Sequence, residues 1–312
     1  MAIDVVTFGE AMMLLVADQP GPLEQAQAFV KRTAGAETNV AIGLARLGLQ
    51  VAWCSRLGMD SMGRYLLHAM QAEGIDCSHV VCEASQRTGF MIKGRVLGGG
   101  DPEVEYHRTG SAASLFQPAE IDTAWLVGAR HLHATGIFAA LSPSCLATSI
   151  ASMDAMRTHG KTISFDPNLR PSLWASEEHM RQTINSLACK AHWVLPGIEE
   201  GKLLTGQDSP EGIAQFYLDA GVSLVVIKLG AAGAYWATAQ QSAYVAGFPV
   251  AQVVDTVGAG DGFAAGVVSG MLEGLAVQDA VRRGAWIGAR AVQVLGDTEG
   301  LPTHAQLAQA PL

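Results

Sequence analysis

Short apolar runs alternate with longer segments of helical periodicity over most of the chain. The runs that predict strands lie at residues 3–8, 51–55, 130–134, 162–165, 193–195 and 224–228. Helices are predicted at residues 38–47, 142–159, 177–189, 198–204 and 210–220, with another ending near residue 73. This alternation predicts an α/β fold with a mostly parallel sheet and helices on both of its faces. Ligands of such sheets bind at the carboxyl ends of the strands.

A second group of extended segments interrupts the alternation in the first third of the chain. Residues 88–97 and 103–108 are joined by a Gly-rich turn at residues 98–102, which is typical of a hairpin. With residues 12–16 and 29–30 they could form a small sheet of their own. An ordinary hairpin at the edge of the main sheet is the alternative.

Composition narrows the classes of protein to consider. The chain has 312 residues, 49% of them hydrophobic and 16% charged, which indicates a globular enzyme-like protein. Its net charge of −9 argues against a nucleic-acid or anionic-membrane partner. The five cysteines are scattered and odd in number, as in reduced cytoplasmic proteins. We find no signal segment and no apolar run long enough to span a bilayer.

Candidate chemistry concentrates at residues 255–263, Asp-Thr-Val-Gly-Ala-Gly-Asp-Gly-Phe. Apolar residues 250–254 before this stretch predict a strand end, and residues 263–275 after it predict a helix. Small residues at a helix start leave backbone N–H groups free for an anion such as phosphate. The same positive field favours the ionised form of Asp261, which could then accept a proton from an attacking hydroxyl. The alternative is a tight glycine turn followed by an ordinary first-turn carboxylate.

This stretch resembles the C-terminal signature of the ribokinase-like, or phosphofructokinase-B-type, carbohydrate kinases. The resemblance implies that Asp261 is the catalytic base. It also implies that the backbone of Gly258, Ala259 and Gly260 is the anion hole.

A second block resembles the N-terminal signature of the same family. It runs from Gly35 through Asn39 to Gly48 and continues with a Gly-x-Asp-x-x-Gly pattern at residues 58–63. In the family the positions of Gly35 and Asn39 line the sugar pocket. The alternative for Asn39 is a first-turn residue that bonds its own backbone.

The resemblance covers essentially the whole chain and implies a single three-layer ribokinase-like domain over residues 1–312. The small sheet then becomes a lid over the sugar, built from residues 11–17, 28–33 and 88–109. Family members often also use this sheet to form homo-oligomers.

The resemblance places ATP near Lys228 and Gly230, at the end of a strand in the stretch Lys-Leu-Gly-Ala-Ala-Gly that closes with Gly233. A plain turn is the alternative there. The small residues around Ala285 would suit an adenine ring packed on backbone, although helix packing explains them equally well.

Two acidic residues are candidates for the neighbourhood of metal ions. In relatives the counterpart of Glu200 helps to hold Mg²⁺ and phosphate through water, and transfer from ATP requires a divalent ion. Gly197 departs from the family pattern, in which Asn is usual. The resemblance alone suggests a monovalent cation, K⁺, near Asp255.

The acceptor is suggested by Tyr106, Arg108 and Arg170. Two arginines near one pocket could bind a carboxylate of the acceptor. A neutral sugar would not require these two positive charges. Pairing of each arginine with a surface acid is the alternative. The surrounding residues resemble the 2-keto-3-deoxygluconate kinases, in which these side chains contact the sugar acid. A fructokinase, and a non-catalytic sugar- or nucleotide-binding regulator, are the rival interpretations.

Overall fold

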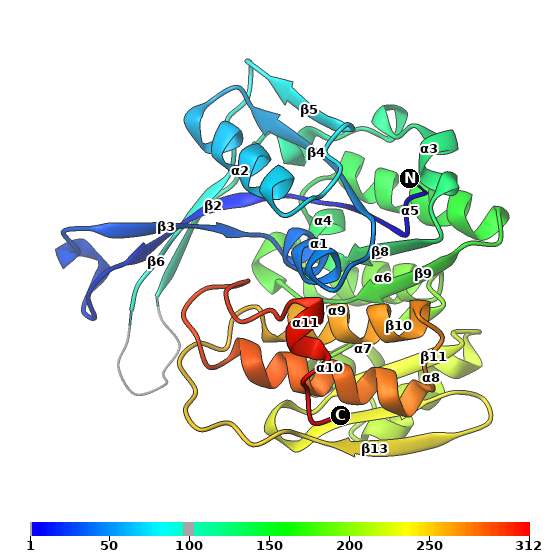
Figure 1. Cartoon of the computed structure of the whole chain (residues 1–312). Helices are drawn as coiled ribbons and strands as arrows, with labels where there is room; N and C mark the ends of the chain where they lie inside the picture. The colour runs from blue at the N-terminus through cyan, green and yellow to red at the C-terminus, as the bar shows by residue number, and fades with distance from the viewer. Residues whose placement is uncertain (1, 96–102) are drawn as a thin grey trace.

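The computed structural model describes residues 2–95 and 103–312, so the predicted turn at residues 98–102 and the end of the segment 88–97 lie outside the described residues. Its main sheet has nine strands in the order β13-β12-β11-β10-β9-β8-β1-β4-β5 (Figure 1). In chain order these are β1 (Val5–Phe8), β4 (Val51–Gly58), β5 (Val80–Glu83), β8 (His131–Thr135), β9 (Thr162–Asp166), β10 (Trp193–Val194), β11 (Leu224–Lys228), β12 (Gly233–Ala237) and β13 (Ser242–Ala246). All neighbours pair in parallel except β11 with β12 and β12 with β13, which confirms the predicted α/β class.

Helices cover both faces of this sheet because neighbouring residues of each strand point to opposite sides. In β1, Val5 belongs to the core on one face and Val6 to the core on the other. The first face carries α1 (Ala36–Arg46), α2 (Ser61–Ala72), α9 (Ala259–Leu272), α10 (Val277–Ala291) and α11 (His304–Leu307). The second carries α3 (Thr123–Gly128), α4 (Gly136–Ala140), α5 (Pro143–Thr158), α6 (Glu177–Ala188), α7 (Ile198–Thr205) and α8 (Pro210–Asp219).

A separate sheet of four strands projects from the body in the order β3-β2-β6-β7 (Figure 1). Its strands are β2 (Met12–Ala17), β3 (Phe29–Ala34), β6 (Phe90–Lys93) and β7 (Val104–His107). A small core of its own holds it together, with Leu14, Val16 and Met91 buried in it. The prediction of a small sheet distinct from the main one is therefore confirmed.

The segment before the anion-hole motif corrects one prediction. Residues 250–254 form no strand, and the helix after them begins at Ala259 rather than at Phe263. Val253 and Val254 remain exposed, because β13 already closes this edge of the sheet. The segment is held by the end of α10 instead, where the amide of Val254 donates to the carbonyl of Val292 at 2.7 Å.

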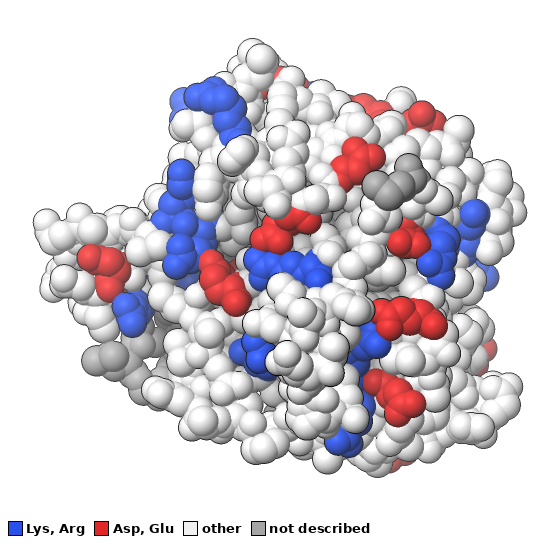
Figure 2. Space-filling model, viewed as in Figure 1, with Lys and Arg blue, Asp and Glu red and all other residues white. Residues whose placement is uncertain are grey.

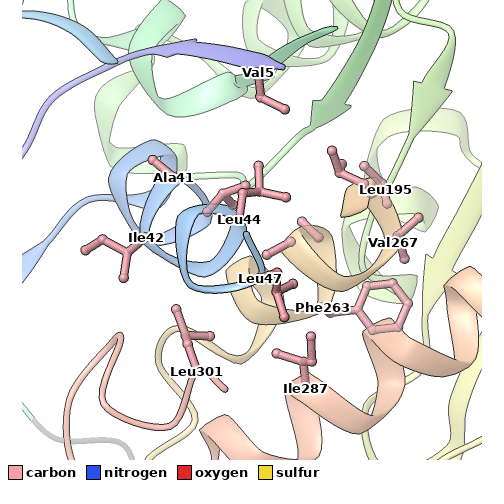
Figure 3. Close-up of a cluster of buried hydrophobic side chains, with 14 of the residues drawn as sticks. Val5, Ala41, Ile42, Leu44, Leu47, Leu195, Phe263, Val267, Ile287 and Leu301 are labelled. Atoms are coloured by element: carbon pink, nitrogen blue, oxygen red, sulfur yellow. The ribbon is translucent and has the colours of Figure 1, made fainter. Parts of the chain in front are cut away.

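The packing of α1, α9 and α10 sets the position of the motif. Figure 3 shows Leu44 of α1, and Leu47 directly after this helix, beside Phe263 of α9 and Ile287 of α10. The guanidinium of Arg46, at the end of α1, donates to the carbonyls of Thr298 (2.6 Å) and Leu301 (3.3 Å). The segment after α10 is thereby fixed against the N-terminal half of the chain.

Acidic and basic side chains are interspersed over the face seen in Figure 2. In the portion of the chain that the structure describes, no helix has both the length and the apolar character needed to cross a membrane.

Candidate active site

A cavity of about 320 Å³ lies between the carboxyl edge of the main sheet and the small sheet. It is lined by Asn168 and Arg170 after β9, by Lys228 at the end of β11, and by Met91 and Tyr106 of the small sheet. The other predicted site residues on its wall are Gly35, Asn39, Arg108, Glu200, Gly258, Gly260 and Asp261. The structure thus brings together residues from both signatures.

The start of α9 forms one end of the cavity. Gly258 precedes the helix with a φ of 81°, a left-handed conformation that favours glycine. A Cβ at this position would lie 2.3 Å from the carbonyl oxygen of Asp297, so only glycine fits. Gly260 follows in the first turn, whose amides have no partner within the helix. The amide of Ala259 reaches the carbonyl of Thr256 at 3.4 Å, and Ala259 is not on the cavity wall.

Asp261 lies in the first turn of α9 and is held by two amides. The Nδ2 of Asn39 donates to its Oδ2 at 2.8 Å, and the Nδ2 of Asn168 donates to its Oδ1 at 3.3 Å. The first bond shows that the Asn39 side chain serves Asp261 rather than its own backbone.

The charge state of Asp261 differs from the sequence expectation. Burial raises the pKa of Asp261 to about 8, and the carboxylates of Asp166 and Asp297 act in the same direction. The bond from Asn39 and the charge of Lys228 lower it by less. Desolvation therefore outweighs the Asn39 hydrogen bond and the Lys228 charge, and the neutral acid is favoured near pH 7.

The two arginines have different surroundings. The guanidinium of Arg108 is buried against Glu10, with Nη2 and Nε at 2.6 and 2.7 Å from Oε2, and Ser111 donates to the other oxygen of Glu10. Arg170 donates to the carbonyl of Leu169 at 2.9 Å and forms no ion pair with any residue in 2–95 or 103–312. Arg170 is therefore the cavity's uncompensated guanidinium, while Arg108 pairs with a buried acid rather than a surface one.

Lys228 also faces the anion hole. Its Nζ lies 2.6 Å from Oδ2 of Asp166 and would be 3.6 Å from a Cβ on Gly260. This places an ammonium group beside the first turn of α9, where phosphate oxygens would meet it.

Glu200 braces two loops on the cavity wall. Its oxygens accept the amides of Leu169 and Gly197, each at 2.7 Å. Each oxygen retains a lone pair, so a water-mediated contact to a metal fits this geometry. In the described parts of the chain no group of three or more His, Cys, Asp or Glu side chains could hold a metal. Mg²⁺ in phosphate sites uses one or two carboxylates with waters and phosphate, so this donor set suits it.

Asp255 lies behind the anion hole, buried from solvent. Its Oδ2 is 2.6 Å from Nζ of Lys93, which comes from β6 of the small sheet. An ammonium group thus lies beside the carboxylate near which the sequence suggested a monovalent cation.

The remaining nucleotide candidates lie off this cavity wall. Gly233 has a φ of 103°, and a Cβ there would be 2.0 Å from the carbonyl oxygen of Val245, so the β12–β13 hairpin requires glycine. Gly230 forms a turn with a φ of 60°. Ala285 is buried in the core of α9 and α10, next to Gly284, whose Cβ would be 2.8 Å from the carbonyl oxygen of Phe263. Helix packing thus explains Gly284, and a nucleotide contact of Ala285 stays a prediction.

Several functional candidates were not selected from the sequence. Glu10, Asn168 and Asp297 line the cavity, and Lys93 lies behind it. Asn168 follows β9 within the Asp-Pro-Asn sequence, so its place at a strand end could have identified it. No comparable local signal marks Lys93.

Comparisons with known proteins agree with this geometry. A model of the pfkB family carbohydrate kinases matches residues 2–304. The chain is 50% identical over 309 residues to 2-dehydro-3-deoxygluconokinase from Bacillus subtilis (strain 168), covering 99% of this chain and 95% of that protein. A crystal structure of a PfkB protein from Polaromonas sp. JS666 is 65% identical with a TM-score of 0.92, covering 99% of this chain and 100% of that one. The crystal structure of a fructokinase double mutant from Vibrio cholerae O395, in fructose-, ADP- and potassium-bound form, is 28% identical with a TM-score of 0.85. The match covers 99% of this chain and 98% of that one.

Proposed function

The chain belongs to the pfkB family of carbohydrate kinases, and we propose that it phosphorylates 2-keto-3-deoxygluconate (2-dehydro-3-deoxygluconate) with ATP to give 2-keto-3-deoxy-6-phosphogluconate. The observation that carries this proposal is the uncompensated guanidinium of Arg170 on the wall that also holds Asp261. A carboxylate on the acceptor would neutralise that cation, and a bidentate fork would fix its orientation. The name and 50% identity of the Bacillus subtilis relative support the same acceptor.

The other contacts of the acceptor follow from the cavity wall. Tyr106 presents its ring from β7, and Gly35 lets the backbone approach closely at the start of α1. We assign Arg108 a hydrogen-bonding contact with the sugar acid. Its positive charge does not contribute to that contact, because Glu10 already neutralises the guanidinium. Arg170 then supplies most of the discrimination between acid and neutral sugar.

Asp261 is the general base in this proposal. Its carboxylate accepts the proton of the acceptor's primary hydroxyl, whose oxygen forms a bond to the γ-phosphorus of ATP as the bond from that phosphorus to the β–γ bridging oxygen breaks. ADP leaves with the electron pair of that bond, and Asp261 later releases its proton to solvent. Amides at Gly258, Ala259 and Gly260, with Lys228, stabilise the charge on the transferred group.

Mg²⁺ bound with ATP would neutralise phosphate charge during transfer. Glu200 would hold it through water, with its carboxylate kept in place by the amides of Leu169 and Gly197. We also propose a cytoplasmic location, which the free thiols of all five cysteines support.

The test compares Arg170→Met with the wild type on 2-keto-3-deoxygluconate, gluconate and fructose, by following ADP release. Loss of a charged hydrogen bond should lower kcat/KM for the keto-deoxy acid about ten- to hundredfold and leave the value for fructose within about twofold. Arg64→Met removes an exposed arginine that is not on the cavity wall and is the matched control.

Three results would contradict the proposal. Preference of the wild type for fructose, or equal losses on charged and neutral sugars in Arg170→Met, would favour a fructokinase. Absence of ADP formation with every sugar, together with tight ligand binding, would favour a non-catalytic regulator.

A further inference from the structure

The buried pair of Lys93 and Asp255 joins two parts of the molecule that are far apart in sequence. Lys93 ends β6 in the small sheet, and Asp255 lies in the segment that leads to the anion hole. Their side chains are 1% and 3% exposed, and Nζ and Oδ2 are 2.6 Å apart. A charge pair removed from water in this way is costly unless each partner is fully compensated.

The charge of Lys93 also acts on a second buried carboxylate, that of Asp297. Asp297 is buried, and its pKa is raised to about 6 by burial, against which the charge of Lys93 acts. Its Oδ1 has no hydrogen-bond partner among residues 2–95 and 103–312. Removal of the ammonium would therefore leave the buried Asp255 without its ion-pair partner and Asp297 without the positive charge that lowers its pKa.

Both carboxylates belong to segments that shape the anion hole. Asp255 Oδ1 accepts the amide of Val257 at 3.1 Å, directly before Gly258. The carbonyl oxygen of Asp297 is the group that leaves no room for a Cβ on Gly258. Asp255, neutralised by Lys93, also accepts the amide of Gly296 at 3.5 Å and so joins the two segments that set the conformation of Gly258.

A free monovalent cation does not fit the same place. Such an ion needs oxygen ligands, and the Oδ2 that Asp255 would offer is already within 2.6 Å of an ammonium nitrogen. A second positive charge there would meet repulsion at short range in a buried site.

We propose that Lys93 is a positioning residue that supplies, from within the chain, the positive charge required behind the anion hole, so that phosphoryl transfer by this protein requires no monovalent cation. The inference uses the proposed kinase reaction for one readout and protein stability for the other. Lysine suits the role because its ammonium is a compact charge on a long flexible stem.

The test compares wild type, Lys93→Met and Lys93→Arg in equal concentrations of KCl, NH₄Cl and tetramethylammonium chloride. ADP is measured by chromatography of stopped samples, so that no coupling enzyme adds a salt dependence of its own. The midpoint of thermal unfolding is measured in the same salts without substrate. Lys190→Met is the matched control, since Lys190 pairs with Asp154 at the same 2.6 Å distance on the surface.

The wild type should have the same turnover, within twofold, and the same unfolding midpoint in all three salts. Lys93→Met should lose at least tenfold in kcat in tetramethylammonium, recover part of it in K⁺ or NH₄⁺, and unfold about 5 °C or more below the wild type with a partial gain in K⁺. Lys93→Arg, which keeps the charge, should stay independent of the salt, and Lys190→Met should match the wild type.

Activation of the wild type by K⁺ above fivefold over tetramethylammonium would overturn the inference. A Lys93→Met protein with wild-type turnover and midpoint in tetramethylammonium, or one that no small cation rescues, would also overturn it. If Lys93→Met does not fold, the wild-type and Lys93→Arg comparisons decide. If no sugar acid is phosphorylated, the proposed function fails, while the unfolding midpoints in the three salts still test the role of Lys93.

Discussion

Asp261 is the residue whose surroundings most directly determine when the site can work. It is 8% exposed and receives hydrogen bonds from Asn39 and Asn168, yet burial raises its pKa to about 8. A base must be ionised to accept a proton, so the fraction of competent protein falls as pH drops below that value. The same burial removes water that would compete for the transferred phosphoryl group.

We predict that kcat/KM for the sugar acid rises about tenfold per pH unit below pH 8 and becomes constant above it. The sign follows from the raised pKa, because the inactive, protonated acid predominates below it. Initial rates from pH 5.5 to 9.5, at substrate concentrations well below KM, give this profile.

Glu37 provides the control, because it also lines the cavity and burial raises its pKa to about 7. Glu37→Gln should leave the break near pH 8 in place, whereas Asp261→Asn should lower kcat by about a hundredfold or more. A wild-type profile that stays flat from pH 5.5 to 9.5 would show that Asp261 is ionised throughout, as the sequence alone suggested.

Residues in local sequence patterns could be predicted as site residues, whereas their partners from distant parts of the chain could not. Asp261 and Arg170 could be selected because each stands in a local pattern after a predicted element. The partners of Arg108 and Asp255 could not, since Glu10 and Lys93 are 98 and 162 residues away from them. Only the fold determines such pairs, and they decide which charges remain available to a ligand.

At the scale of elements, α9 begins earlier than its sequence favours. Glycine has low intrinsic helix propensity, and three glycines stand before Phe263, at positions 258, 260 and 262. The sequence therefore favours a helix that starts at Phe263. Tertiary contacts override that preference: the helix packs on α1 and α10, and Asp297 closes over Gly258. The early start places Asp261 in the first turn, close to the amides that would bind phosphate.

The two ends of α9 offer a paired test of this geometry. Gly258→Ala and Gly274→Ala both replace glycines with φ near 80°, but a Cβ at Gly274 meets nothing within 4 Å. We expect Gly274→Ala to lower the free energy of unfolding by about 1 kcal/mol, for the left-handed backbone alone. Gly258→Ala should cost about 1–3 kcal/mol more because of the clash with Asp297.

Urea unfolding measures both costs, and turnover should fall only in Gly258→Ala. Equal stability losses in the two variants would mean that Asp297 moves aside without penalty, and that the close approach does not hold the anion hole.

Other elements were missed or misplaced for a common reason. The edge strand β5, at Val80–Glu83, was not predicted, and it lies at the margin of the sheet with Val81 exposed. Residues 250–254 have the apolar character of a strand but lie outside the sheet. An apolar run shows that a segment is compatible with a sheet, whereas strand order decides whether a place in the sheet is available.

At the scale of the whole molecule, both sheets contribute to one cavity. The main sheet supplies the phosphate end, with Lys228 and the start of α9 beside it, and the small sheet supplies Met91 and Tyr106. This shared cavity supports the proposal that residues 1–312 form a single kinase domain. It also supports the role of the small sheet as a lid over the acceptor.

The lid sheet ends in β3, an edge strand with Phe29 and Val30 exposed. Unpaired edges with apolar side chains favour association, so we propose a homo-oligomer formed through the lid. Val30→Asp should shift the mass measured by light scattering towards the 32.7 kDa monomer.

Val81→Asp alters an equally exposed valine on the edge of the main sheet and should leave the oligomer intact. A wild type that is monomeric at every concentration, or an oligomer that dissociates only in Val81→Asp, would contradict assembly through the lid.

The hydrogen bonds from Arg46 to the carbonyls of Thr298 and Leu301 join a helix that is synthesised early to a segment that is synthesised much later. A ribosome completes α1 well before residues 292–301, and N-terminal segments begin to fold during synthesis. A nascent chain that already contains Asp261 still lacks Asp297, which packs against Gly258. The catalytic end is therefore assembled only after residues 292–301 have been made, and a chain that stops before residue 297 would lack activity although it contained every motif residue.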